Sequence, residues 1–154
     1  MLRRMTESAN ANRAALRRRV VVGAGLAIIA RAAGARAHDF QRGSIHVGHP
    51  WARPAAAGQH GEVYMALVNR GEASDRLVAA ATEIARVARI VGDAAEAIDL
   101  APGRPVALRP GGRHVRLEGL ARRLAAGDRF ELTLRFARAS SFAVEVIVED
   151  APGH

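Results

Sequence analysis

The segments DRFELTLRF, residues 128–136, and FAVEVIVED, residues 142–150, decide the fold class of this chain. Every second residue in both segments is apolar: Phe130, Leu132, Leu134 and Phe136 in the first, and Phe142, Val144, Val146 and Val148 in the second. This period of two predicts strands that each bury one face. Residues 137–140 form a short connection, so the two strands are predicted to pair as a β-hairpin.

Further short segments of the same kind precede this hairpin in the 154-residue chain. The segment GEVYMALVNRG, residues 61–71, places Val63, Met65 and Leu67 on one face, which predicts that Met65 belongs to the core. Weaker strand candidates, separated by glycine and proline, are residues 75–82, 86–91, 96–100 and 105–112. Short strands at spacings of roughly 8–12 residues, without alternating helical segments, predict an all-β antiparallel sandwich or barrel.

The positive charge of the chain is concentrated at its N-terminus. Residues 1–37 hold eight of the 23 arginines and one acidic residue, a net charge of +7. Residues 38–154 hold the other 15 arginines and 14 acidic residues, a net charge of +1. Aromatic residues make up only 4% of the sequence, too few for platforms on which bases stack. We therefore expect no nucleic-acid binding.

The N-terminal segment has the three parts of an export signal. Three consecutive arginines, residues 17–19, precede an apolar run at residues 20–30. Ala35-Arg36-Ala37 fits a small-x-small cleavage site, and Ala30-Arg31-Ala32 is a second candidate upstream. The apolar run is shorter than the roughly 18–20 residues that span a bilayer. Residues 1–37 are predicted to be a signal of the twin-arginine type, and residues 38–154 the exported, periplasmic domain. The alternative is an uncleaved N-terminal membrane anchor.

No catalytic motif is present: the sequence lacks GxSxG, HExxH, P-loop and GxGxxG patterns, so an enzyme is not expected. Because the chain has no cysteine, a transition-metal site must use histidine, methionine, carboxylate or a terminal amine. His46 and His49 are three residues apart, which places them on opposite faces of a strand unless a bulge intervenes. His60 lies in a loop rich in glycine and alanine. His114 falls on the predicted solvent face of residues 113–118, where a lone histidine is usually a surface residue.

Two long segments, HPWARPAAAGQHGEVYMALVNRGEASDRLVAAA at residues 49–81 and LRPGGRHVRLEGLARRLAAGDRFELTLRF at residues 108–136, resemble the periplasmic copper(I) chaperone family with its PCu(A)C-like domain. The resemblance runs from about residue 45 to residue 149. It includes the Pro-Trp-Ala-Arg entry, the strand ending in Asn-x-Gly, and the Pro-Gly-Gly-x-His turn. It implies a cupredoxin-like β-sandwich of Greek-key type that is exported and carries Cu(I) toward the copper site of cytochrome oxidase.

The metal motif of that family is largely missing from this chain. The family uses a His, a Met about eleven residues later, and then a His-x-Met, in which soft thioethers suit Cu(I). Only His114 carries over, because Arg116 stands where the family has Met. Residues 87–91, where the first His is expected, contain no His, and residues 92–97 contain no Met. The guanidinium of Arg116 disfavours a nearby cation unless a carboxylate such as Glu118 pairs with it.

These observations favour a copper-chaperone-like protein with a degenerate or relocated metal site. Cleavage after Ala37 would give His38 a terminal amine beside its imidazole, a pair suited to Cu(II). The candidate metal ligands are His114, His38, His49 and His60. The implied partner is a periplasmic component of cytochrome oxidase copper-site assembly, with no stable membrane span after cleavage. The alternative is a metal-free β-sandwich that binds a periplasmic protein.

Overall fold

The computed structural model describes residues 39–92 and 96–150. The chain divides into two units, Met1–Ala32 and Ala33–His154, and all described residues belong to the second. The predicted export signal, residues 1–37, and the candidate ligand His38 lie outside the described residues. The predicted boundary between residues 37 and 38 therefore stays a prediction.

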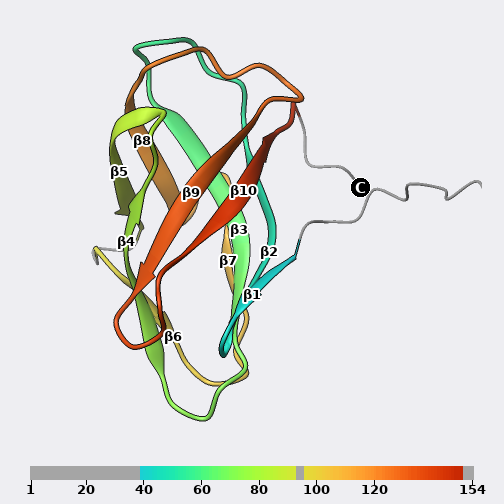
Figure 1. Ribbon diagram of the computed structural model, residues 1–154, viewed down its shortest axis with the longest axis vertical. Helices are drawn as coiled ribbons and strands as arrows, with labels where there is room; N and C mark the ends of the chain where they lie inside the picture. Colours follow the sequence, from blue (N-terminus) through green and yellow to red (C-terminus); the bar gives the residue numbers. More distant parts are fainter. Residues whose placement is uncertain (1–38, 93–95, 151–154) are drawn as a thin grey trace, which may run out of the picture. The chain divides into compact units, whose positions relative to one another are not determined.

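The described residues form ten strands and no helix, which confirms the all-β fold class (Figure 1). The strands are β1 (Phe40–Arg42), β2 (Ile45–Ala52), β3 (Gly61–Asn69), β4 (Asp75–Ala81), β5 (Ala85–Val91), β6 (Ile98–Leu100), β7 (Val106–Leu108), β8 (His114–Leu120), β9 (Arg129–Phe136) and β10 (Phe142–Val148). Each segment that alternation predicted as a strand therefore contains one. The weaker candidates correspond to β4, β5, β6 and β7.

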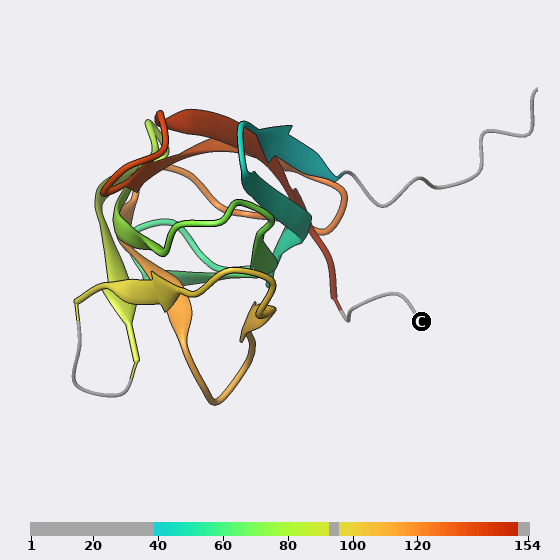
Figure 2. The same ribbon diagram turned by 90° about the horizontal axis from the view of Figure 1, so that it is seen from below.

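The strands are hydrogen-bonded in the order β5-β8-β3-β2-β10-β9-β4-β6, with β1 added to β2 and β7 to β3. All pairs are antiparallel except β2 and β10, which run parallel. Seen from below, the strands surround a central core (Figure 2). The cupredoxin-like β-sandwich implied by the family resemblance is thus confirmed, with one parallel pair, β2 and β10, that alternation did not reveal.

The hairpin of β9 and β10 supplies one wall of the core. Its register pairs Leu132 with Val144 and Phe130 with Val146, and these side chains are buried. Burial of every second residue along β9 explains the alternation, because the intervening side chains face water. On β3, Val63, Met65 and Leu67 are buried on the inner face, which confirms Met65 as a core residue.

Two acidic side chains fix the loops between strands. Asp75 is buried, and its carboxylate accepts backbone N–H bonds from Arg76, Arg138 and Ala139 at 2.7–2.9 Å. Burial alone would raise the pKa of Asp75, but these three bonds together outweigh burial and lower it. Because the carboxylate binds two distant segments, it fastens the start of β4 to the turn after β9.

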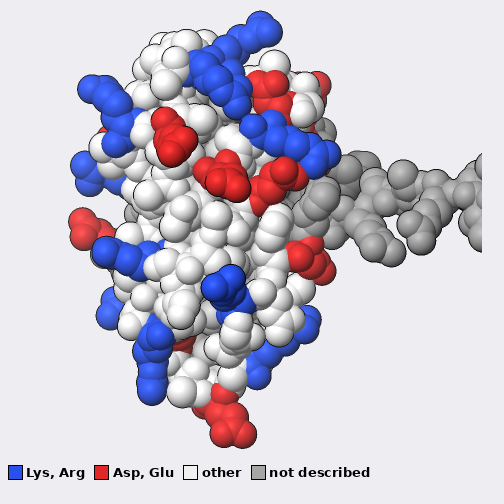
Figure 3. Space-filling model, in the orientation of Figure 1, with Lys and Arg blue, Asp and Glu red and all other residues white. Residues whose placement is uncertain are grey.

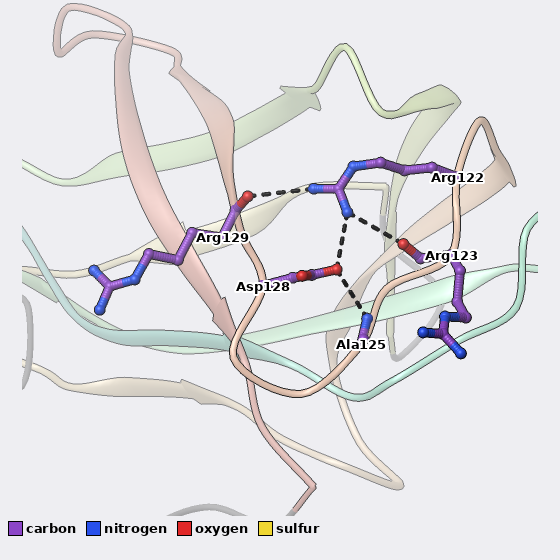
Figure 4. A network of polar contacts seen from close by, with 5 residues as sticks. All are labelled: Arg122, Arg123, Ala125, Asp128 and Arg129. Carbon is purple, nitrogen blue, oxygen red and sulfur yellow. Dashed lines mark hydrogen bonds and ion pairs between the residues drawn. The ribbon is translucent and has the colours of Figure 1, made fainter.

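Asp128 orders the connection between β8 and β9 (Figure 4). Its carboxylate accepts the backbone N–H of Ala125 at 2.9 Å and pairs with the guanidinium of Arg122 at 2.9 Å. The same guanidinium donates to the carbonyl oxygens of Arg123 and Arg129. The Ala125 bond, followed by the Arg122 bond, lowers the pKa of Asp128. Asp128 thus holds the turn that leads into β9.

Charges of both signs are interspersed on the face of the domain drawn in Figure 3. Ion pairs join several charges of the domain, such as Arg129 with Glu145 at 2.6 Å and Arg76 with Asp99 at 3.1 Å. No broad area of positive charge covers this face, in keeping with the balanced composition of residues 38–154.

Candidate functional site

The candidate site lies on the outer face of β3 and β8. These strands are antiparallel neighbours, with Glu62 opposite Arg116 and Val63 opposite Val115. Val63 and Val115 point into the core. Glu62 and Arg116 therefore share the outer face, because side chains alternate along each strand.

His114 belongs to this outer face, but it is not the surface residue that the sequence suggested. Only 8% of the residue is exposed. Its ring lies beside the ring of Tyr64, with 6.2 Å between the centroids. The prediction of solvent exposure was wrong because alternation identifies the face of a strand, whereas neighbouring strands decide how deeply that face is covered.

The hydrogen bond of His114 fixes which ring nitrogen is available. The Nδ1–H donates to the carbonyl oxygen of Gly112 at 2.8 Å, which leaves Nε2 to carry the lone pair in the neutral ring. Nε2 is buried and has no hydrogen-bond partner. The Oε1 atom of Glu62 lies 3.6 Å from it. A histidine held at Nδ1 by a backbone carbonyl, with Nε2 left open, has the arrangement of a metal ligand.

Glu62 is oriented in the same way, through its other oxygen. Its Oε2 accepts a hydrogen bond from the hydroxyl of Tyr64, so Oε1 is the oxygen that faces His114. The Tyr64 bond is the largest cause of the lowered pKa of Glu62, burial opposes it, and the charges of His114, Arg116 and His60 lower the pKa further. The carboxylate is therefore ionised at neutral pH.

Tyr64 is held by aromatic and cationic neighbours. Its ring lies 4.6 Å from that of Trp51, and the guanidinium of Arg53 lies 6.0 Å from its centroid. Burial, then the bond to Glu62 and the charge of Glu62, raise the pKa of Tyr64 to about 12, although Arg53 opposes this. Tyr64 is thus protonated at neutral pH and acts as a fixed donor to Glu62.

The thioether site of the resembled family does not fit these residues. Met65 lies on the inner face of β3, is 2% exposed and packs in the core. Among the residues that the structure describes, no methionine therefore faces His114. The segment predicted to hold the first His forms β5, and its Val91 lies opposite His114. The structure thus brings the segment expected to hold the first His beside His114, with valine at the facing position.

Arg116 places a fixed positive charge beside the candidate pair. Its Nε atom is buried without a hydrogen-bond partner. Glu118, the carboxylate considered as its neutralising partner, instead pairs with Arg89 at 3.4 Å. Glu62, opposite Arg116 in the register, is the carboxylate whose pKa responds to the charge of Arg116.

The remaining described histidines are dispersed. His46 faces Asp39 at 3.4 Å, and His49 faces Glu149 at 3.3 Å. A bulge between Gly48 and Trp51 interrupts β2. Such a bulge was the condition for His46 and His49 to share one face and chelate a metal together. Within residues 39–92 and 96–150, however, no three His, Cys, Asp or Glu side chains form a group that could hold a metal. The exposed His60 lies directly before β3.

Sequence reasoning missed Glu62 and Tyr64. The signal was present in GEVYM, since alternation places both residues on the face opposite Val63 and Met65. The sequence did not reveal that β3 pairs with β8. This pairing brings Glu62 to His114, although some 50 residues separate them along the chain.

Comparison with known proteins agrees with this fold and places the chain in a family. Residues 45–148 match the family model of LpqE-like lipoproteins. The apo PCuAC domain from PmoF1 is 32% identical, with a TM-score of 0.70, and the match covers 74% of this chain and 100% of that one. The chain therefore belongs to the LpqE-like family, and its β-sandwich is a PCuAC-type domain.

Two further similar structures are of copper-bound proteins. The copper-bound PCuAC domain from PmoF2 is 31% identical, with a TM-score of 0.69 over 74% of this chain and 99% of that one. The structure of CuI-DR1885 from Deinococcus radiodurans is 27% identical, with a TM-score of 0.53 over 67% and 78%. A search of curated protein sequences gave no significant match. The described residues include no helix long and apolar enough to span a membrane.

Proposed function

We propose that this chain is an exported, non-enzymatic copper carrier that holds copper at His114 and Glu62. The observation that carries the proposal is the orientation of the two open ligand atoms. His114 Nε2 and Glu62 Oε1 face each other at 3.6 Å, while Nδ1 and Oε2 are held by Gly112 and Tyr64. Hydrogen bonds of this kind orient metal ligands and raise affinity in known sites.

The donor atoms favour a different oxidation state from that of a His and Met site. Imidazole nitrogen and carboxylate oxygen suit Cu(II), whereas thioether sulfur suits Cu(I). Arg116 should weaken the binding of either ion. Its guanidinium is always positively charged and lies opposite the proposed ligand Glu62, so it repels a copper ion bound there. We therefore expect Cu(II) to bind more tightly than Cu(I), and both to dissociate readily, as cargo rather than a resident cofactor should.

The proposed location is the periplasm, reached through the signal at residues 1–37. The lipoprotein description of the family fits an exported protein. We propose release by cleavage after Ala37, with an uncleaved N-terminal membrane anchor as the alternative. The proposed recipient is a periplasmic component that assembles the copper site of cytochrome oxidase, in line with the sequence resemblance.

The deciding experiment is titration of the full chain with Cu(II), and with Cu(I) under reducing conditions, against a competing chelator. We expect Cu(II) binding tighter than micromolar that His114→Ala and Glu62→Gln each weaken by about tenfold or more. Matched controls are His46→Ala and Glu145→Gln, a histidine and a glutamate in other ion pairs. If neither ion binds tighter than micromolar, the metal-free binding module replaces this proposal.

His38 is proposed as a second, independent source of Cu(II) affinity after cleavage. Its terminal amine and imidazole would chelate together. A chain that starts at His38 is expected to bind one more Cu(II) than a chain with one extra residue before His38. Equal stoichiometry in the two chains would contradict this role.

A further inference from the structure

His49 occupies a strained position in β2. Its φ of 45° makes it the one non-glycine residue with positive φ among the described residues. The pairing of β2 with β3 shifts register between Gly48 and Trp51, so His49 lies within a bulge. Bulges redirect side chains and occur often beside functional sites, and strained backbone persists where the surroundings hold it in place.

The bulge directs His49 toward Glu149, the residue directly after β10. The Nε2 atom of His49 lies 3.3 Å from Oε2 of Glu149. Both atoms are buried and neither makes a hydrogen bond. The position of Glu149 is fixed by its backbone N–H, which donates to the carbonyl oxygen of Ala52 on β2 at 2.9 Å. Two buried polar atoms thus face each other without satisfying each other, which is unusual in a folded protein.

We propose that His49 and Glu149 form a site for a divalent cation of the Zn(II) or Cu(II) type. Two ligands that are each about 2.0–2.1 Å from a tetrahedral ion lie roughly 3.3–3.4 Å apart. The separation of 3.3 Å matches this spacing, and an ion between the two atoms would satisfy both. Imidazole and carboxylate are also ligands that these ions accept.

Water completes the coordination in this proposal. No third His, Cys, Asp or Glu of the described residues joins the pair. The side chains of His49 and Glu149 are 40% and 23% exposed, so solvent reaches the ion from outside while the ligand atoms stay buried. A site with two protein ligands binds weakly and exchanges its ion quickly.

His46 on the same strand provides the contrast. Its Nε2 faces Asp39 at a similar 3.4 Å, but the Asp39 side chain is 54% exposed, so water satisfies that carboxylate. Nε2 of His46 and both carboxylate oxygens of Asp39 are not among the buried atoms without partners; His46 Nδ1 is one of those atoms, but it is Nε2 that lies 3.4 Å from Asp39. The His46 pair is therefore an ordinary ion pair, and it serves as the control.

The test is titration of the full chain with Zn(II), followed through the ring-proton resonances of the histidines in NMR spectra. We expect the resonance of His49, assigned with His49→Ala, to shift on Zn(II) addition. Glu149→Gln, which preserves shape, should weaken this shift by about tenfold or more in apparent Kd. The matched variants Glu145→Gln on β10 and His46→Ala on β2 should leave it unchanged.

Two results would overturn the site. One is a His49 resonance that does not move at millimolar Zn(II), and the other is a Glu149→Gln variant that binds as well as the unmodified chain. Either result makes His49 and Glu149 a plain ion pair. This inference is independent of copper binding at His114, because His114→Ala and Glu62→Gln should leave the His49 response intact. Each site can thus fail without the other.

Discussion

Replacing Arg116 with methionine should convert the site toward Cu(I). His114 and Arg116 are two residues apart on β8, so their backbone positions on one face lie about 6.6–6.8 Å apart. A unit charge at about 7 Å contributes about 2 kcal/mol of repulsion to a bound monovalent ion at an effective dielectric constant of about 20. Physiological salt reduces this repulsion to about 1 kcal/mol.

Removal of the charge should therefore tighten Cu(I) binding by roughly fivefold to thirtyfold, since about 1.4 kcal/mol is tenfold. Arg116→Gln measures this electrostatic part alone. Arg116→Met adds a thioether two residues from His114 on the same face, so it should bind Cu(I) more tightly than the glutamine variant. Arg135→Met on β9, on a strand away from the site, controls for a surface methionine that binds copper by itself.

The assay is competition for Cu(I) with a chromophoric chelator under reducing conditions, at low and at physiological salt. The Gln variant should lose part of its advantage at high salt, because salt screens the charge it removes. Equal Cu(I) affinity of the unmodified chain and both variants would show that Arg116 does not control the site, and would refute the placement of copper beside it.

Two further substitutions test the supports of the site and of the fold. Tyr64→Phe keeps the ring beside Trp51 but removes the hydroxyl that donates to Glu62. Cu(II) affinity should therefore fall by about tenfold or more, while the thermal unfolding temperature changes little. An unchanged Cu(II) affinity would mean that the Tyr64 hydrogen bond does not orient a ligand. Asp75→Asn should lower the free energy of unfolding by about 1–3 kcal/mol at pH 7, measured by urea denaturation. Because the pKa of Asp75 is lowered in the folded chain, its stabilisation is complete above the unfolded pKa of about 3.9 and is lost as pH falls through the folded pKa. The free energies of unfolding of Asp75→Asn and of the unmodified chain should therefore differ less at pH 3 than at pH 7. An equal difference at the two pH values would exclude this role of the charge.

The sequence by itself determined the fold class and, in the strongly alternating strands β9 and β10, the face on which each residue lies. Alternation in residues 128–136 and 142–150 is strong because one face of each strand is buried and the other is wet, and the observed register pairs these segments as predicted. Met65 was assigned to the core by the same rule. The resemblance carried by the Trp and His motifs pointed to the family that the comparisons identify.

Only the tertiary structure decided what surrounds His114. Alternation cannot say which strand lies beside another, so the sequence left His114 exposed and Glu62 unnoticed. The pairing of β3 with β8 buries His114 against Tyr64 and places a carboxylate 3.6 Å from its free nitrogen. The bulge that turns His49 toward Glu149 was equally hidden, because it arises from a register shift between strands. Local periodicity fixes the face of a residue, whereas contacts between distant strands fix its neighbours, and the neighbours decide the chemistry of the site.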